Sequence, residues 1–300
     1  MATDYFVNKA STGEAAPYAT KLTAAQELAT VLTYHDNNPS DAIVSVREGT
    51  YTTDYIGDLP NNNLTIISET HLMPILPVID VDCPSWDEAT ALTLTNLSLE
   101  KINCNATVIQ KRGSFYFNSL FVRRSADETP ASIIHPYSVS ADSCIFEGSS
   151  HLTGRALLVD WINSGVPRGY FDRSIFLDSD NGLFCANSFS AMVEVLINDC
   201  IFKGNTIGMR ESMNVVPVAT NCGFYENGTN VSTVVTLVDP VYTDPLFVDP
   251  ANARYDLFTG SDYIGAGVDG GNIGVYQGSG FTGLLVADYY RSLMNILRGI

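Results

Sequence analysis

The sequence predicts an all-β fold of the solenoid type, a single-stranded right-handed parallel β-helix, on two observations. The first is a short phrase that recurs along the middle of the chain, with its clearest copies at 199–205 and 221–227. Self-similarity at a spacing of 22 to 30 residues is typical of stacked architectures. The second is the form of each copy, a short run of apolar, aromatic and β-branched residues followed by Gly, Asn or Asp. That composition indicates a strand followed by a turn.

The copies align into two columns, which together form a predicted interior ladder. Positions two apart on a strand share a face, and stacking successive turns at about 4.8 Å would bury that face. The small-residue column is Ser119, Cys144, Ser174, Cys200 and Cys222, and the aromatic column is Phe121, Phe146, Phe176, Phe202 and Phe224. A leucine-rich repeat is not expected, because the pattern has neither regularly spaced Leu nor an accompanying helix.

The first 40 residues are predicted to form a strand and a capping helix. The strand is expected at 4–8 and the helix over 22–32, where Thr23 and Gln26 can form a capping box. The apolar stripe of this helix would seal the open end of the solenoid. The β-helix rungs then occupy 41–245, and a closing segment occupies 246–280.

The last segment, 281–300, is predicted to form an amphipathic helix. Leu285, Tyr289, Leu293 and Leu297 recur at intervals of four, which places them on one side of a helix. Apolar surface on a terminal helix has to be buried somewhere. Two interpretations stay open: the helix packs back on the β-helix, or it is an arm that docks on a neighbouring subunit.

The charge of the chain limits its partners. The net charge is -17, and no cluster of Lys and Arg is present. Nucleic acid and anionic membrane surfaces both require such clusters, so neither is expected as a partner. The N-terminus lacks the basic and apolar regions of a secretory signal, so we expect synthesis in a host cytoplasm, followed by use there or by exit in a particle such as a virion or through lysis.

The chain has six cysteines, and none is expected to hold a metal. Cys144, Cys200 and Cys222 fall in the interior column, where a free thiol behaves as a small hydrophobic group. Disulfides between neighbouring turns are the open alternative for these three residues. Cys83, Cys104 and Cys185 do not show metal-ligand spacing, and no cofactor is expected.

Both ends of the predicted solenoid resemble a known superfamily. A strand, then Val-Arg-Glu-Gly-Thr-Tyr at 46–51, then Asn-Leu-Thr-Ile-Ile at 63–67, resembles the opening of pectate-lyase-like β-helix proteins. The stretch at 244–276, beginning Asp-Pro-Leu-Phe-Val-Asp-Pro, is similar to the closing segment of bacterial and phage β-helix proteins. The resemblance implies the fold, but the superfamily includes lyases, hydrolases, epimerases, phage spikes and structural proteins.

The search for catalytic residues yields only weak candidates. Asp178, Asp180 and Asp199 lie on neighbouring predicted turns, and glycoside hydrolases need two or three carboxylates. However, Asp178 and Asp180 precede Asn-Gly, which is a good turn sequence. The residue series of polygalacturonases and the Ca²⁺ cluster of pectate lyases, which the resemblance would imply for an enzyme, do not occur in the chain.

Together these features lead us to expect a structural virion protein. The resemblance implies a capsid decoration, cement or tail-associated β-helix that binds neighbouring subunits. It also implies a homo-oligomer such as a trimer, in contact with other virion or assembly proteins or with a surface glycan. The alternative is a polysaccharide lyase or hydrolase that acts along an exposed groove of the β-helix.

Overall fold

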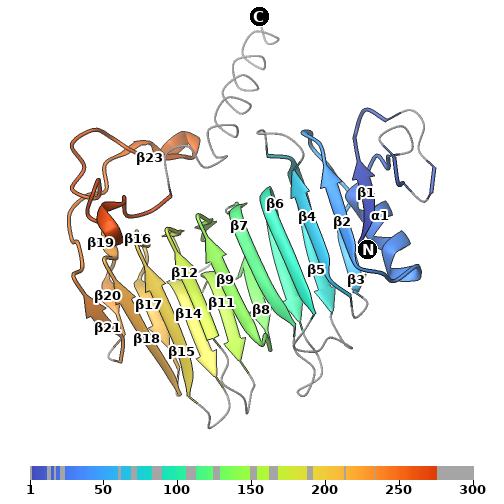
Figure 1. Ribbon diagram of the computed structural model, residues 1–300. Helices are drawn as coiled ribbons and strands as arrows, with labels where there is room; N and C mark the ends of the chain where they lie inside the picture. Colours follow the sequence, from blue (N-terminus) through green and yellow to red (C-terminus); the bar gives the residue numbers. More distant parts are fainter. Residues whose placement is uncertain are drawn as a thin grey trace, which may run out of the picture.

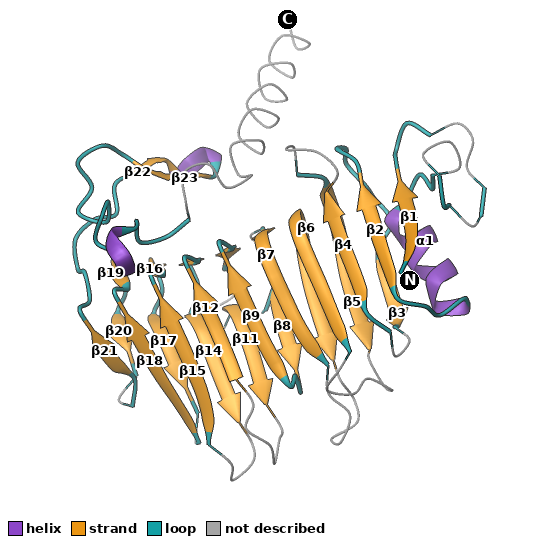
Figure 2. Ribbon diagram, viewed as in Figure 1, coloured by secondary structure: helices purple, strands orange, loops and turns teal. Residues whose placement is uncertain are grey.

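A computed structural model describes most of the chain up to Val275. The described residues are 2–275, except 12–14, 17, 21–23, 60–61, 69–72, 83–89, 106–112, 124–128, 149–153, 162–167, 188–191, 213 and 233. The helix predicted at 281–300, with Leu285, Tyr289, Leu293 and Leu297, lies outside these residues, as do Thr23 and Cys83. The described part is an all-β parallel solenoid, and its strands lie across a rod and stack side by side along its length (Figures 1 and 2).

Each turn of the rod has three faces, and the longest strands form the face that we call the broad face. Its strands alternate apolar residues inward with polar residues outward, as in β15, where Val193, Val195 and Ile197 are buried and Glu194 is exposed. The broad face contains β1 (Thr3–Val7), β2 (Ala42–Val46), β4 (Leu64–Ser68), the first part of β6 (Ala91–Asn105), the first part of β7 (Ser114–Val122), β9 (Ser138–Asp142), β12 (Arg168–Asp172), β15 (Val193–Asn198), β18 (Val215–Thr220) and β21 (Thr236–Val238).

The second face consists of short strands, and we call it the covered face because the end of the chain packs over it. It contains the start of β5 (Ile75–Asp82), the middle of β6, the end of β7, β10 (Ile145–Glu147), β13 (Ile175–Leu177), β16 (Ile201–Lys203) and β19 (Gly223–Tyr225). The third face contains β3 (Tyr55–Asp58), the ends of β5 and β6, β8 (Ala131–Ile134), β11 (Arg155–Trp161), β14 (Asn181–Asn187), β17 (Ile207–Glu211) and β20 (Thr229–Val231).

The core of the rod contains a stack of four phenylalanine rings. Phe146, Phe176, Phe202 and Phe224 follow one another on successive turns, and their rings are nearly parallel. The ring centres are 5.4, 4.9 and 5.2 Å apart in that order. Two positions before each ring lies a buried residue of the small column: Cys144, Ser174, Cys200 and Cys222. The register of β10, β13, β16 and β19 therefore matches the repeat read from the sequence.

The predicted ladder is one position out of register at Ser119 and Phe121. In the structure Phe146 pairs with Val122, and Ile145 pairs with Phe121. Leu120 and Val122 therefore occupy the interior columns, and Phe121 points outward into the covered face. Ser119 instead occupies the corner before this face, with a left-handed φ of 51°. The prediction was wrong here because two aromatic or apolar residues follow each other, and residue type alone cannot separate the two faces.

Two kinds of corner hold the turns together. Between the broad and covered faces, the six successive turns from β6 to β18 each have one residue in the left-handed region: Asn96, Ser119, Ser143, Arg173, Asp199 and Asn221. Between the covered and third faces, a ladder of hydrogen bonds joins the buried Ser179 and Asn205 to the partly buried Asn227. Asn205 Oδ1 accepts from Ser179 Oγ at 2.8 Å, and the backbone N–H of Asn205 donates to Asn227 Oδ1 at 3.0 Å.

The one α-helix of the described residues, α1 (Leu28–Asn37), lies at the N-terminal end of the rod (Figure 2). It packs against β1, β2 and β3 and buries Leu28, Val31 and Leu32. The predicted start at residue 22 was wrong. Glu27 is the N-cap residue and makes no side-chain capping bond, while Gln26 donates to the carbonyl of Ser11. A capping box at Gln26 is therefore not formed.

The end of the described chain, residues 241–275, runs back along the outside of the covered face, and we call it the strap. It contains β22 (Phe247–Asp249), η1 (Pro250–Asn252), β23 (Arg254–Leu257) and η2 (Val268–Gly270), with β22 and β23 antiparallel. Its apolar residues join the outward residues of the covered face in a second core, which includes Ile145, Ile175, Ile201, Tyr255, Leu257, Tyr263 and Ile273. The closing segment expected after residue 245 therefore does not add turns to the rod.

The strap fits closely at two points. Gly223 lies beneath Tyr263, and a Cβ atom at position 223 would be 1.9 Å from the Tyr263 ring. The backbone N–H of Val268 donates to Asp199 Oδ1 at 2.8 Å, and Tyr255 Oη donates to Glu147 Oε1 at 2.6 Å.

We predict that the thiols of the ladder do not react in the folded protein. The five described cysteines are all buried, and Cys144, Cys185, Cys200 and Cys222 are free thiols. Burial raises the pKa of the Cys144 thiol to about 12, and burial together with the bond to Cys222 raises the pKa of Cys200. Thiolate is the reactive form, so a disulfide-exchange reagent should label Cys83→Ser protein only after denaturant is added. The same background with Thr259→Cys, an exposed position on the strap, should label at once. Rapid labelling of the native Cys83→Ser protein would contradict the inward orientation of these cysteines.

Candidate functional site

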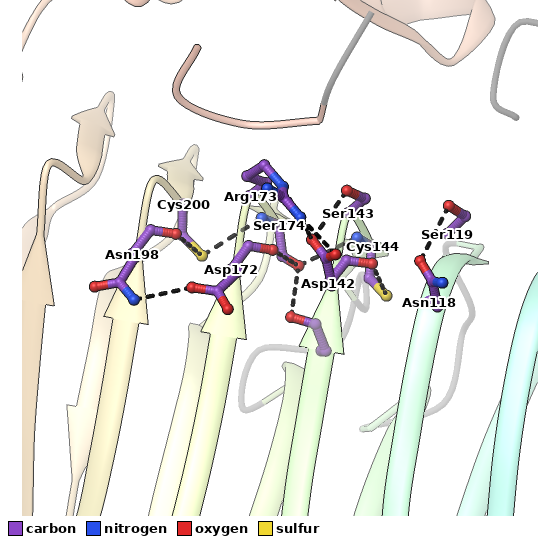
Figure 3. A network of polar contacts seen from close by, with 11 residues as sticks. Asn118, Ser119, Asp142, Ser143, Cys144, Asp172, Arg173, Ser174, Asn198 and Cys200 are labelled. Atoms are coloured by element: carbon purple, nitrogen blue, oxygen red, sulfur yellow. Dashed lines mark hydrogen bonds and ion pairs between the residues drawn. The ribbon is translucent and has the colours of Figure 1, made fainter. Parts of the chain in front are cut away.

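A column of polar side chains follows the outer edge of the broad face, where its strands end. The register places Thr95, Asn118, Asp142, Asp172, Asn198 and Thr220 on successive turns. Neighbouring parallel strands are about 4.8 Å apart, so each side chain can contact the next one along the rod. Figure 3 shows four of these side chains at the strand ends, Asn118, Asp142, Asp172 and Asn198, together with corner residues that follow them.

The centre of the column is an ion pair between Arg173 and Asp142. The guanidinium donates from Nε to Asp142 Oδ1 at 3.0 Å, and from Nη2 to Oδ1 at 2.7 Å and to Oδ2 at 2.6 Å. Ser143 Oγ donates to the same Oδ1 at 3.1 Å (Figure 3). The hydrogen bonds to Asp142 raise the pKa of Arg173 above its ordinary value, so this residue stays a cation. The Asp142 carboxylate is thus held by two side chains at once.

The next carboxylate along the rod is also held by a neighbour. Asn198 Nδ2 donates to Asp172 Oδ1 at 2.9 Å (Figure 3). Asp172 is the direct strand partner of Asp142, so the two carboxylates lie on adjacent turns.

Two tyrosines lie beside these carboxylates on the broad face. Tyr116 and Tyr170 are strand partners of Ser140 from opposite sides, so one turn separates them. Tyr116 is exposed, and Tyr170 Oη accepts a hydrogen bond from Arg168 Nη1 at 3.4 Å. The broad face thus presents aromatic rings, carboxylates and guanidinium groups on one surface.

The structure does not bring the three predicted catalytic aspartates together. Asp178 and Asp180 lie at the corner between β13 and β14, where Asp180 accepts a hydrogen bond from Asn181. Asp199 lies at the opposite corner, before β16, and is buried beneath the strap. Its carboxylate accepts a hydrogen bond from the backbone N–H of Val268, which is a structural role. The turn interpretation of Asp178 fits its exposed side chain and its left-handed φ of 49°.

The residues that form the polar column were missed in the sequence, although the repeat contains a signal for them. Asp142, Asp172 and Asn198 each stand two positions before the small residue of the repeated phrase. Extending the aligned phrase by two residues would have placed them in one outward column.

A second polar cluster lies on the third face, around Phe184. The guanidinium carbons of Arg155 and Arg210 are 4.7 and 5.4 Å from the centre of this ring, which is cation–π distance. Asp160 lies nearby on β11, and its Oδ1 is buried without a hydrogen-bond partner.

We expect replacement of Asp160 by Asn to stabilise the protein at neutral pH. Burial raises the pKa of Asp160, against the opposing effect of His135 and Arg155. The folded state therefore binds the proton more readily than the unfolded chain, and stability falls as pH rises from the unfolded pKa to the folded pKa. Asp160→Asn should raise the melting temperature at pH 7 and change it little below about pH 3.9, where the unfolded group is protonated too. Asp178→Asn, at an exposed position, serves as the control, and a lower melting temperature for Asp160→Asn at pH 7 would contradict the sign of this effect.

The described residues contain neither a metal centre nor a membrane span. Within them, His, Cys, Asp and Glu do not gather in groups of three or more that could hold a metal ion. Likewise, none of their helices is long and apolar enough to cross a membrane. No family model and no curated protein matches the chain.

Proposed function

We propose that this protein is a structural solenoid of a virion, a capsid decoration or tail-associated protein that acts by binding neighbouring subunits. The observation that carries the non-catalytic part of the proposal is the pairing of the carboxylates on the broad face. Asp142 is engaged by Arg173 and Ser143, and Asp172 by Asn198. The proposal includes a right-handed, pectate-lyase-like rod that α1 seals at its N-terminal end.

Catalysis by this pair would require one carboxyl group to give a proton and the other to attack or activate water. A substrate would first have to displace the Arg173 fork from Asp142, with its three hydrogen bonds. Bidentate pairs of this kind are the strong hydrogen bonds of proteins. The arrangement therefore favours a structural role for these carboxylates over a catalytic role.

The virion part of the proposal is supported by the sequence alone. The start of the β-helix resembles that of pectate-lyase-like proteins, and its closing segment is similar to that of bacterial and phage β-helix proteins. A rod with two packed cores also suits a particle surface. The test is mass spectrometry of purified particles from the native source, followed by imaging of where the chain lies. We expect a fixed number of copies per particle, in contact with capsid or tail subunits. Absence of the chain from purified particles would overturn the proposal.

One observation favours the enzymatic alternative and makes it testable. Asp142 and Asp172 lie on adjacent turns, about 4.8 Å apart at the backbone, and carboxyl groups about 5–5.5 Å apart are typical of retaining glycosidases. The purified protein should be assayed against charged and neutral polysaccharides by release of reducing ends and of unsaturated products. The structural proposal expects no release. Cleavage that Asp172→Asn removes and Asp180→Asn retains would establish the enzyme instead.

A further inference from the structure

The two ends of the rod differ in how they are closed. At the N-terminal end, α1 packs against β1, β2 and β3 (Figure 1). At the other end, β20 and β21 are the last strands, and they pair with β17 and β18 on one side only. Among the described residues, no strand pairs with their outer edge. Unpaired strand edges are templates for pairing with another chain.

The last turn also leaves several apolar side chains partly exposed to solvent. Val231 and Leu237 continue the interior columns, but both are only partly buried, whereas their strand partners Met209 and Ala219 are fully buried. Tyr242 lies beyond the top of the phenylalanine stack, with its ring centre 6.3 Å from Phe224, and is 54% exposed. Val234 is 55% exposed. The core therefore ends in an apolar surface at this end of the rod.

The strands at this end carry no charged side chains, although the chain is strongly acidic. Residues 229–238 contain no Asp, Glu, Lys or Arg, although the whole chain has a net charge of -17. Natural edge strands are usually protected by charged residues or proline, and β21 contains neither. Nearby, the charge of Glu226 is balanced by its ion pair with Lys203. Asp239, which directly follows β21, is the charged residue nearest to this strand in the sequence. Two copies of an acidic protein repel each other over most of their surfaces, but this end brings few carboxylates together.

We propose that this end binds the same end of a second copy, so that two rods join tail to tail around a two-fold axis. The axis lies across the rods and reverses the strand direction, so β21 of one copy lies antiparallel to β21 of its partner. A head-to-tail contact would need the other end, which α1 occupies. A tail-to-tail contact is therefore self-complementary and closes at two copies instead of growing into a fibre. The proposal stands independently of the virion assignment.

The test is the mass of the full-length protein in solution, measured by light scattering during size-exclusion chromatography. We expect twice the 32.5 kDa of one chain. Val234→Glu adds one carboxylate of each copy to this apolar contact between two acidic chains, and should weaken the dimer at least about tenfold. Ile56→Glu is the matched control, because Ile56 is 74% exposed on the third face near the N-terminal end, and it should leave the dimer unchanged. Tyr242→Glu provides a second variant at the same end, and circular dichroism checks that each variant is folded.

A rescue experiment separates a direct contact from an indirect effect. Val234→Lys should also weaken self-association, and mixing it with Val234→Glu should restore dimers that contain one chain of each kind. A wild-type monomer at about 100 μM, where a micromolar contact would be saturated, would overturn the proposal. So would a trimer, or a dimer that survives both Val234→Glu and Tyr242→Glu, since the copies would then meet elsewhere.

Discussion

Replacing Phe202 with Ala should cost the protein about 3–5 kcal/mol of unfolding free energy, the usual range for a buried Phe. Phe202 is fully buried, and its ring is stacked on Phe176 at 4.9 Å and on Phe224 at 5.2 Å. Truncation would remove the burial of one ring and also the contacts of both neighbouring rings. A solenoid cannot relax easily around such a cavity, because each turn is fixed by backbone hydrogen bonds to the turns on either side. The measurement is chemical denaturation followed by circular dichroism.

The matched control for Phe202 is Phe258→Ala. Phe258 is 59% exposed on the strap, so its truncation should cost no more than about 0.5 kcal/mol. Equal losses for the two variants would show that the phenylalanine stack does not stabilise the rod.

Replacing Asn205 with Ala should have an effect nearly as large, although it removes little apolar surface. Asn205 is 2% exposed, and its amide makes contacts on three turns. Its Oδ1 accepts from the Ser179 backbone at 3.2 Å and from Ser179 Oγ at 2.8 Å, and its Nδ2 donates to the carbonyl of Phe176 at 3.1 Å. Each buried polar group left without a partner costs about 1–3 kcal/mol, so we expect a total loss of roughly 3–5 kcal/mol.

Asn198→Ala is the control for Asn205, because Asn198 is partly exposed and donates its Nδ2 to Asp172 alone among the bonds described here. Asn198→Ala should lower the free energy of unfolding by about 1 kcal/mol or less. Amide hydrogen exchange adds a local measurement: Asn205→Ala should speed exchange at Ser179, whose N–H loses its acceptor. Unchanged exchange at Ser179, with a loss no larger than that of Asn198→Ala, would show that the corner ladder is not stabilising.

The interior of the rod was predictable because it repeats. Cys200 and Phe202 recur at Cys222 and Phe224 with one spacing, and stacking is the arrangement that buries both columns. The register slip at Ser119 and Phe121 shows the limit of that reasoning, since adjacent apolar residues fit either of two alignments. The dipeptide Ile201-Phe202 shows the same limit, because both of its side chains are buried, on opposite faces of one strand. Alternation with period two identifies a half-buried strand and cannot reveal that a distant segment covers the outer face.

The polar column was harder to predict, because its members interact only after the chain has made a full turn. Arg173 and Asp142 are 31 residues apart, and Asn198 and Asp172 are 26 residues apart. Charged residues at strand ends read individually as turn residues, and they align only when whole turns are compared, as in the register of β9, β12 and β15. The aspartates chosen from the sequence, Asp178, Asp180 and Asp199, were grouped because they fall on neighbouring predicted turns, which does not distinguish one corner of a turn from another.

The strap has a consequence for the order in which the protein can be completed during synthesis. Translation delivers the turns from the N-terminus onward, and each new turn can pack on the one before it. The outward side chains of Ile145, Ile175 and Ile201 are different, because their cover lies within residues 241–275. A nascent chain that ends before residue 241 therefore exposes the apolar outer side of the covered face. Chaperones and other nascent chains can bind this exposed apolar face until the strap has been synthesised and packs over it.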